Sequence, residues 1–332
     1  MTTIPLRDIE AAVTIVHAHM RPTPEIHWPL LSARTGCEVI VKHENHTPIG
    51  AFKIRGGLNY MYRLAESEPD CPGVITATRG NHGQSVARAA TALGMRSVIY
   101  VPHGNNPEKN IAMQAFGAEL KEFGDDFQES REEAGRVGAA EGLHMIPPFH
   151  PDLVAGVGTY AWELMMAHPE LFEAAGELDA VYVPIGMGSG ICGLISARDG
   201  LGLATKIVGV VADKAPAYAL SFEAGKPVET NDANTFADGV ACRAPDPSAV
   251  AIINAGADRI VRLAEDEFRA AMQAYFFDTH NIAEGAGAGA LAGLLQEKEK
   301  MAGKKVGVIL SGGNADRAQF QQALCTDCSR WT

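Results

Sequence analysis

The chain has 332 residues, a net charge of −12 and 35 glycines, with 46% hydrophobic and 20% charged residues. This is the composition of a globular protein, and the glycines follow no three-residue period, so a disordered chain and a collagen are excluded. The acidic balance argues against a nucleic-acid partner, and no apolar run approaches the roughly 18 residues of a membrane helix. We expect one large domain or two ordinary ones, with neither nucleic acid nor membrane as a partner.

The N-terminal segment carries Arg7, Asp8 and Glu10 where a signal peptide would have an apolar core. Its apolar residues fall at helical spacing instead, at Leu6, Ile9, Val13 and Val16. This pattern predicts an amphipathic first helix and a cytoplasmic protein.

The six cysteines do not form a disulfide framework. Four of them are widely scattered, and Cys325 and Cys328 form one CxxC pair. A structural zinc site needs four ligands, and no second pair has suitable spacing. We therefore expect no metal site and cysteines that are incidental and lie at the surface.

Short β-branched runs recur along the chain, and each precedes a glycine-containing turn and a helix-like stretch. These runs span residues 39–41, 74–77, 97–101, 180–184, 207–211 and 306–310. Strands that alternate with helices predict an α/β fold with a mainly parallel sheet. Ligands bind such sheets at the carboxyl ends of the strands, which is where these turns lie.

The turn at 186–190, Gly-Met-Gly-Ser-Gly, follows a strand and precedes a helix-like stretch. Successive backbone N–H groups at a helix N-terminus bind anions such as phosphate, and glycines allow a close approach. Residues 188–193, GSGICG, also match the dinucleotide fingerprint, with Asp213 placed 20 residues later. A phosphate-bearing cofactor, a nicotinamide cofactor and a purely structural turn all remain open at this point.

Three further segments bear on that choice. Residues 311–314, SGGN, end a strand, and residues 78–83, TRGNHG, offer side-chain donors at a second strand end. Lys53 lies in AFKIRGG and is unremarkable alone, because most lysines are solvated surface groups. A reactive amine, a phosphate cradle and polar groups from separate strand ends together are what a Schiff-base cofactor requires.

The four segments AFKIRGG, TRGNHGQ, PIGMGSG and SGGN, in this order, resemble the motifs of fold type II pyridoxal-phosphate enzymes, the tryptophan synthase β-like fold. The nearest branch is that of threonine/serine dehydratases and serine racemase, and the resemblance runs from about residue 20 to residue 320. It implies two lobes, each with a mainly parallel sheet flanked by helices. The large lobe would comprise residues 1–67 and 149–332, and residues 68–148 would form a small mobile lobe. It also implies bound pyridoxal 5'-phosphate and a homodimer.

The resemblance assigns roles to individual positions. Lys53 matches the catalytic lysine that forms the Schiff base with the cofactor. The other cofactor-binding positions that it implies are Phe52, Asn81, Gly186, Met187, Gly188, Ser189, Gly190, Gly239, Glu284 and Ser311. The substrate-binding positions that it implies are Thr78, Arg79, Gly80, Asn81 and His82.

The implied activity is elimination of water from an L-3-hydroxy amino acid, which gives a 2-oxo acid and ammonia. Threonine, serine and bulkier analogues remain candidate substrates, among them aryl-serines such as phenylserine, hydroxyaspartate and a hydroxy-diamino acid from compatible-solute breakdown. The residues 43–48, HENHTP, are either a plain strand end and loop or part of the pocket that selects among them. The alternatives are a nicotinamide oxidoreductase, a β-replacement enzyme of the same fold and, least favoured, a non-catalytic binding protein.

Two departures from the racemase pattern sharpen this prediction. Arg79 stands where serine racemase has a serine that acts as a base, and an arginine is effectively always protonated. We therefore expect no substantial racemase activity, and Arg79 is either a structural ion-pair residue or a substrate contact. The divalent-metal carboxylates of the racemase branch align with Val211 and Ala217, with Asp213 as a possible substitute, so we expect no metal site there.

Overall fold

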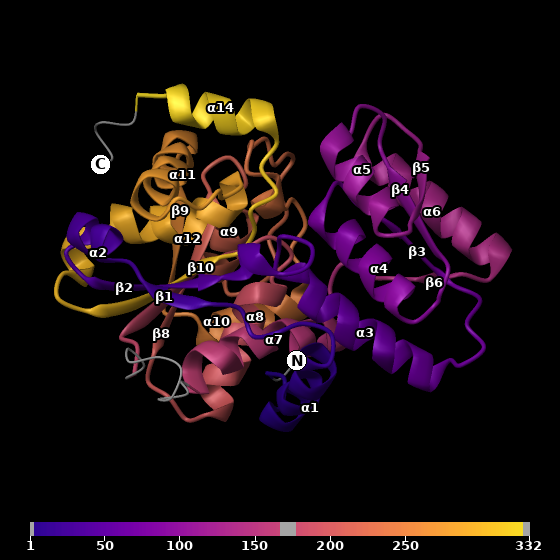
Figure 1. The fold of residues 1–332 in the computed structure, drawn as a ribbon, viewed down its shortest axis with the longest axis horizontal. Coiled ribbons are helices and arrows are strands. Elements are labelled where there is room, and N and C mark those ends of the chain that lie inside the picture. Colours follow the sequence, from indigo (N-terminus) through magenta and orange to yellow (C-terminus); the bar gives the residue numbers. More distant parts are fainter. Residues whose placement is uncertain (1–2, 167–176, 328–332) are drawn as a thin grey trace.

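A computed structural model describes residues 3–166 and 177–327, and these two ranges hold ten strands in two sheets (Figure 1). The strands are β1 (Glu25–His27), β2 (Glu38–His43), β3 (Val74–Ala77), β4 (Ser97–Val101), β5 (Glu119–Glu122), β6 (His144–Met145), β7 (Ala180–Pro184), β8 (Lys206–Ala212), β9 (Arg259–Leu263) and β10 (Lys305–Leu310). The helices are α1 (Leu6–His17), α2 (Pro29–Thr35), α3 (Lys53–Ser67), α4 (Asn81–Ala92), α5 (Pro107–Ala115), α6 (Phe127–Glu141), α7 (Pro151–Met166), α8 (Ser189–Gly200), α9 (Ala217–Ala224), α10 (Pro247–Gly256), α11 (Glu265–Thr279), α12 (Gly285–Gln296), α13 (Lys298–Met301) and α14 (Arg317–Cys325). Two short 3₁₀ turns, η1 (Glu44–His46) and η2 (Asp238–Val240), complete the elements.

The larger sheet has the strand order β1-β2-β10-β7-β8-β9, and all its pairs are parallel except β1 with β2. Its central strands β10, β7 and β8 are buried almost without alternation because both faces are covered. Val208 and Val210 of β8 pack in the core formed with α11 and α12, while Ile207 and Val211 pack on the opposite face with α7, α8 and α10.

The smaller sheet has the order β5-β4-β3-β6, and all its pairs are parallel. Figure 1 shows it with α4, α5 and α6 as a body to one side of the larger sheet. The chain enters this body after α3 and leaves it before α7, so the long helix α3 lies where the two bodies meet (Figure 1).

The predicted α/β class with parallel sheets flanked by helices is confirmed. The strands expected at 74–77, 97–101 and 180–184 have those bounds, and the other three expected runs lie inside β2, β8 and β10. The expected first helix is α1. Within the described residues, no helix is long and apolar enough to cross a membrane.

The expectation of surface cysteines is wrong at three positions. Cys37, Cys192 and Cys242 are buried, because a free cysteine packs as a small hydrophobic side chain. Burial raises the pKa of the Cys192 and Cys37 thiols, which keeps them protonated. Cys325 is exposed, and Cys328 lies outside the described residues.

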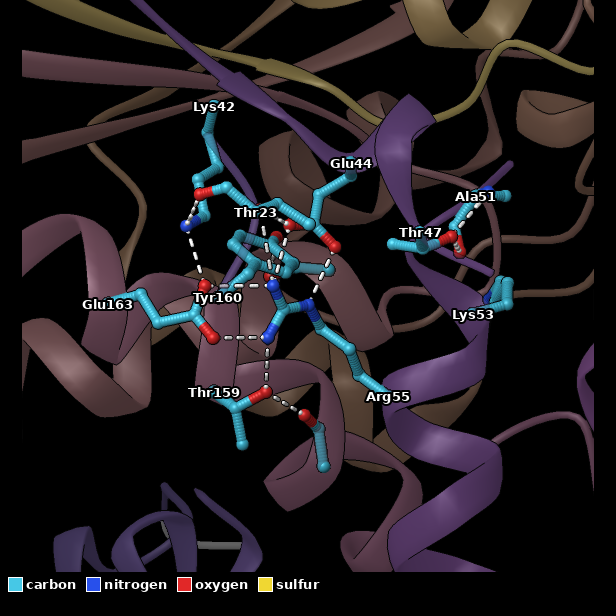
Figure 2. A network of polar contacts seen from close by, with 12 residues as sticks. Thr23, Lys42, Glu44, Thr47, Ala51, Lys53, Arg55, Thr159, Tyr160 and Glu163 are labelled. Atoms are coloured by element: carbon cyan, nitrogen blue, oxygen red, sulfur yellow. Dashed lines mark hydrogen bonds and ion pairs between the residues drawn. The ribbon is translucent and has the colours of Figure 1, made fainter. Parts of the chain in front are cut away.

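A buried ionic network anchors the first turn of α3 (Figure 2). Arg55 is fully buried, and its guanidinium donates to the carboxylates of Glu44 at 2.7 Å and Glu163 at 2.7 Å. Lys42, also fully buried, donates to the second oxygen of Glu163 at 2.6 Å. Burial alone would lower the pKa of Arg55, but the attraction of the two carboxylates raises it, so the guanidinium stays charged. The network ties the helix that begins at Lys53 to η1 and α7.

Candidate active site

Lys53 is the first residue of α3, and the backbone before it is held against the end of β10. The Phe52 N–H donates to the Ser311 carbonyl oxygen at 3.0 Å, and Ala51 forms a β-bridge with Gly312. Thr47 fixes the approach to the helix, because its Oγ1 accepts from Ala51 N at 2.9 Å and donates to Ala51 O at 2.8 Å (Figure 2). The segment with Lys53 and the SGGN turn are therefore adjacent.

The Lys53 side chain points to the turn after β7. Its Nζ lies 3.2 Å from Ser189 Oγ and 4.9 Å from the centre of the Phe52 ring. Burial lowers the pKa of Lys53 from 10.5 to about 8, and no carboxylate of the described residues counteracts this shift. A buried amine beside a neutral hydroxyl is poised to act as a nucleophile and as a base near neutral pH.

The 186–190 turn joins β7 to α8 and opens that helix. Gly188 is the N-cap of α8 with φ of +96°, a conformation that favours glycine. The Met187 carbonyl accepts a hydrogen bond at 2.9 Å from the hydroxyl of Tyr218, a buried residue. A Cβ on Gly186 would overlap the carbonyl oxygen of Gly239, so these two predicted positions are neighbours.

Phe52 and Gly190 also meet. A Cβ on Gly190 would lie 3.8 Å from the Phe52 ring, and Tyr160 OH donates to the Gly190 carbonyl at 2.9 Å. The Phe52 and Tyr160 rings are in edge-to-face contact with their centres 6.1 Å apart. Tyr160 therefore contacts both residues, Phe52 with its ring and Gly190 with its hydroxyl.

Asn81 begins α4 and links the smaller sheet to the larger one. Its Nδ2 donates to Glu284 Oε1 at 2.6 Å, and its Oδ1 accepts from Asn314 Nδ2 at 2.8 Å. Burial raises the pKa of Glu284 to about 7, although the charge of Lys109 opposes the shift. Glu284 is 5% exposed, and its Oε2 has no hydrogen-bond partner in the described part of the chain.

The remaining residues of the TRGNHG turn divide into buried and exposed groups. Thr78 is buried, and its Oγ1 accepts from Gly80 N at 3.1 Å, which shapes the turn. His82 Nε2 is buried without a partner in the described residues, and burial together with the charge of Lys53 lowers the pKa of His82 to about 3. Arg79 is exposed. In the described residues it forms no ion pair, so the structure gives no support to a structural ion-pair role.

This arrangement fits pyridoxal phosphate on three observations. The turn that opens α8 presents backbone N–H groups, and Gly186 and Gly188 pack so closely against Gly239 O and Ala249 Cβ that neither position has room for a side chain. The Lys53 amine has a lowered pKa. Two buried polar atoms, His82 Nε2 and Glu284 Oε2, face no protein partner among the described residues and are available to a ligand.

Three residues at this site were not assigned from the sequence. Asn314 belongs to the SGGN motif, and its amide could have been suspected from its place at a strand end. Asp238 directly precedes Gly239, and Lys109 forms an ion pair with it. Lys109 lies in the sequence PEKN, which carries no signal that separates it from a surface lysine.

The 43–48 segment is a strand end and loop. Glu44 belongs to the Arg55 network, and His43 is buried and accepts from Trp28 Nε1 at 3.0 Å. Asn45 and His46 both contact the Asn281 side chain, at 3.1 and 3.0 Å. These contacts support the backbone beside the SGGN turn.

The fold and site together define a pyridoxal-phosphate enzyme of fold type II. The model of the family "Pyridoxal-phosphate dependent enzyme" matches residues 16–312, and the chain belongs to this family. The predicted family and cofactor are confirmed, which removes the nicotinamide interpretation of GSGICG.

The chain is similar to members of the branch of this family that contains threonine dehydratases and serine racemases. The chain is 34% identical over 315 residues to L-threo-3-hydroxyaspartate ammonia-lyase of Saccharomyces cerevisiae, a match that covers 94% of each chain. The processed form of threonine deaminase isoform 2 from Solanum lycopersicum is 31% identical with a TM-score of 0.87, over 96% of this chain and 91% of that one. Maize serine racemase is 26% identical with a TM-score of 0.88, over 97% of both chains.

Proposed function

We propose that the protein is an ammonia-lyase that removes water from an L-3-hydroxy amino acid and yields a 2-oxo acid and ammonia. The observation that carries this function is the Lys53 amine, which contacts the strand-end turn after β7 and has a lowered pKa and a hydroxyl as its neighbour. Relatives named as ammonia-lyases and threonine dehydratases support the same class of reaction.

Pyridoxal phosphate, when bound, supplies an aldehyde for the substrate amine and a conjugated ring that delocalises charge from the substrate Cα. The N-terminal turn of α8, from Gly186 to Gly190, would hold its phosphate, and Phe52, Asn81, Gly239, Glu284 and Ser311 would surround its ring. Ser311 is neutral, so it would not stabilise a positive charge beside it as an aspartate would.

Lys53 Nζ, once released by the substrate amine, is the base that takes the proton from the substrate Cα. Its pKa of about 8 leaves a useful fraction of the amine neutral near pH 7 to 8. The β-hydroxyl leaves as water with one added proton, which balances the proton that Lys53 Nζ takes from the substrate Cα. The product then reacts with water to give the 2-oxo acid and ammonia, so all atoms are accounted for.

The substrate carboxylate would bind at the turn from Thr78 to His82. This turn opens α4, where backbone N–H groups and the helix dipole favour an anion. His82 is neutral because of its lowered pKa, so it can share a hydrogen bond without adding charge. Arg79 is exposed, and the proposal gives it a contact with a substituent of the substrate.

The proposal also includes the organisation of the molecule. Residues 68–148 would form a small lobe that moves against residues 1–67 and 149–332, and the chain would act as a cytoplasmic homodimer. The lobe boundaries, at 67/68 and 148/149, fall in the two stretches where the chain passes between the sheets. The lobe movement would open the site for substrate and close it for the reaction.

The test is an assay of 2-oxo acid and ammonia across L-serine, L-threonine, L-threo-3-hydroxyaspartate, L-phenylserine and 3-hydroxy-2,4-diaminobutyrate. We expect both products in equal amounts from at least one of these, without an added thiol, and none from Lys53→Ala. Lys121→Met, which removes an exposed lysine, is the matched control and should retain full activity. Release of a β-substituted amino acid only in the presence of thiol, or no reaction from the cofactor-loaded protein, would refute the assignment.

A further inference from the structure

Lys109 is a buried lysine at the junction of the two sheets, and no motif drew attention to it. It is 8% exposed and lies in the first turn of α5. Asn106 caps that helix, because its Oδ1 accepts from Glu108 N at 2.8 Å and Lys109 N at 3.1 Å, and Pro107 occupies the first helical position. The start of α5, and with it the position of Lys109, is therefore fixed by local sequence.

One face of α5 covers the turn that begins α4. Lys109 and Met113 are four residues apart and so lie on the same side of the helix. A Cβ on Gly83 would overlap Met113 Sδ, and a Cβ on Gly80 would lie 3.0 Å from Lys109 Cδ and 3.5 Å from its Nζ. The ammonium group is thus placed directly against the turn proposed to bind the substrate carboxylate.

The surroundings of this ammonium group are rich in carboxylates. Lys109 Nζ donates to Asp238 Oδ2 at 2.5 Å, across the junction of the two bodies. Burial alone would lower the pKa of Lys109, but the charges of Asp238 and Glu284 raise it, so the ammonium is charged at neutral pH. A cavity of about 170 Å³ lies beside Lys109, lined also by Gln84, which follows the turn, and by Asn314 and Asp316.

An α-amino acid brings one more carboxylate into this region. Two negative charges within a few ångströms repel strongly where burial limits screening by water. The ionised form of the buried Glu284, and to a smaller degree the half-exposed Asp238, would therefore oppose binding of the substrate carboxylate unless a positive charge offsets them. Lys109 contacts Asp238 and lies against Gly80, so it is suitably placed to do so.

We propose that Lys109 is a specificity-determining residue that selects ligands with an α-carboxylate, by offsetting the charges of Asp238 and Glu284 beside the Gly80 turn. The role requires an α-amino acid as ligand, so the inference rests on the proposed function. It predicts that Lys109 acts on ligand binding and much less on the chemical step at Lys53.

The experiment measures binding rather than turnover. Calorimetric titration of the cofactor-loaded protein uses L-alanine, which has no β-substituent to lose, and L-alaninamide, which lacks the carboxylate charge. We expect Lys109→Met to weaken L-alanine binding by about tenfold or more, because the nearby carboxylates would then repel its carboxylate without an opposing charge, and to change L-alaninamide binding less than about threefold. Lys109→Arg should keep most of the preference for L-alanine, and Lys121→Met should keep all of it.

Asp238→Asn is the second variant, because Asp238 is 41% exposed and its replacement leaves the buried lysine in place. It removes a competing carboxylate, so L-alanine should bind as tightly as to the natural protein or more tightly. The inference fails if Lys109→Met, with its melting temperature retained, weakens both ligands equally or neither, or if Asp238→Asn selectively weakens L-alanine. If the natural protein binds neither ligand, the proposed function itself fails, and the role of Lys109 fails with it.

Discussion

Ser85 Oγ donates a hydrogen bond to the main-chain carbonyl oxygen of Lys53 at 2.7 Å. Ser85 lies in α4, beside the smaller sheet, whereas Lys53 begins α3 and contacts the turn of the larger sheet. A Cβ on Gly57 would overlap Ser85 Oγ, so α3 and α4 approach this closely because residue 57 has no side chain. The contact sets the spacing between the lysine and the turn at Gly80.

Gly57→Ala is therefore expected to destabilise the protein by about 1–3 kcal/mol through overpacking, and to lower kcat/KM. Ser85→Ala removes the hydroxyl and should cost about 1 kcal/mol. The double variant should lose less than the sum of the two, because the methyl group added at position 57 then meets less crowding. Urea unfolding measures all three.

Gly135→Ala is the matched control for that series. Gly135 is helical and exposed, and a Cβ there meets no atom within 4 Å. The substitution should stabilise the protein by about 0.5–1 kcal/mol, the ordinary gain of alanine over glycine in a helix. Equal effects at positions 57 and 135 would contradict a close approach of α3 and α4.

The pKa of Lys53 predicts how stability depends on pH in the cofactor-free protein. Burial lowers this pKa to about 8 from 10.5, so between these values the unfolded chain binds more protons than the folded one. Stability should therefore rise with pH across this window, and the penalty for a charged buried amine is present in full below pH 8. Lys53→Met should raise the unfolding free energy at pH 7 by about 1–3 kcal/mol and by much less at pH 10. A gain that is equal at both pH values would contradict the lowered pKa.

Gly188→Ala should impair cofactor binding as well as folding. Residue 188 has φ of +96° at the start of α8, and a Cβ there would lie 2.8 Å from Ala249 Cβ and 3.1 Å from Tyr218 OH. Gly142→Ala is the matched control, because Gly142 has φ of +68° with no atom within 4 Å of a Cβ. Both variants should lose about 1–2 kcal/mol of stability from backbone strain, and Gly188→Ala should lose about 1–3 kcal/mol more from the crowding against Ala249. Only Gly188→Ala should also raise the Kd for pyridoxal phosphate, by about tenfold or more; equal Kd values would contradict the placement of the phosphate.

The strand-end turns could be predicted from the sequence because each follows a continuous β-branched run, and parallel strands bring their carboxyl ends together. The motifs also placed distant residues in one site. Gly186 and Gly239 are 53 positions apart, yet a Cβ on Gly186 would overlap the carbonyl oxygen of Gly239. Four strands were not predicted. The strands β1, β5 and β6 have only two to four residues with polar neighbours and give no periodic signal, and β9 carries two arginines that interrupt its apolar run.

The charged groups of the interior could not be predicted in the same way. Arginine and lysine are residue types that usually lie at the surface. Arg55, Lys42 and Lys109 are buried because carboxylates from distant segments offset the free-energy cost of burying their charges. Glu163 lies 108 positions from Arg55, and Asp238 lies 129 positions from Lys109. Pairing over such separations is a property of the folded chain.

Arg55→Met should be among the most damaging substitutions away from the reacting groups. It leaves Glu44 and Glu163 buried with their strongest partner removed, and such a loss costs about 3–5 kcal/mol. Arg55→Lys keeps the charge but not the paired hydrogen bonds, so an intermediate loss is expected. Arg136→Met, which breaks an exposed pair with Glu133, should change stability by less than about 1 kcal/mol. Urea unfolding of the three variants tests the order, and an Arg55→Met variant as stable as Arg136→Met would contradict the network's role.

Substitutions of Arg79 test whether this residue decides between elimination of water from L-serine and its racemisation. An arginine cannot accept a proton from the substrate on the face opposite Lys53, whereas the serine of the racemase branch is expected to do so. The natural protein should therefore release 2-oxo acid from L-serine without forming D-serine. Arg79→Ser should raise the ratio of D-serine to 2-oxo acid by about tenfold or more, measured by chiral chromatography, while Arg79→Lys should not. Because Arg79 is exposed, stability should change by no more than about 0.5 kcal/mol in either variant. D-serine formed by the natural protein at a rate near that of elimination would show that residue 79 does not decide between the two reactions.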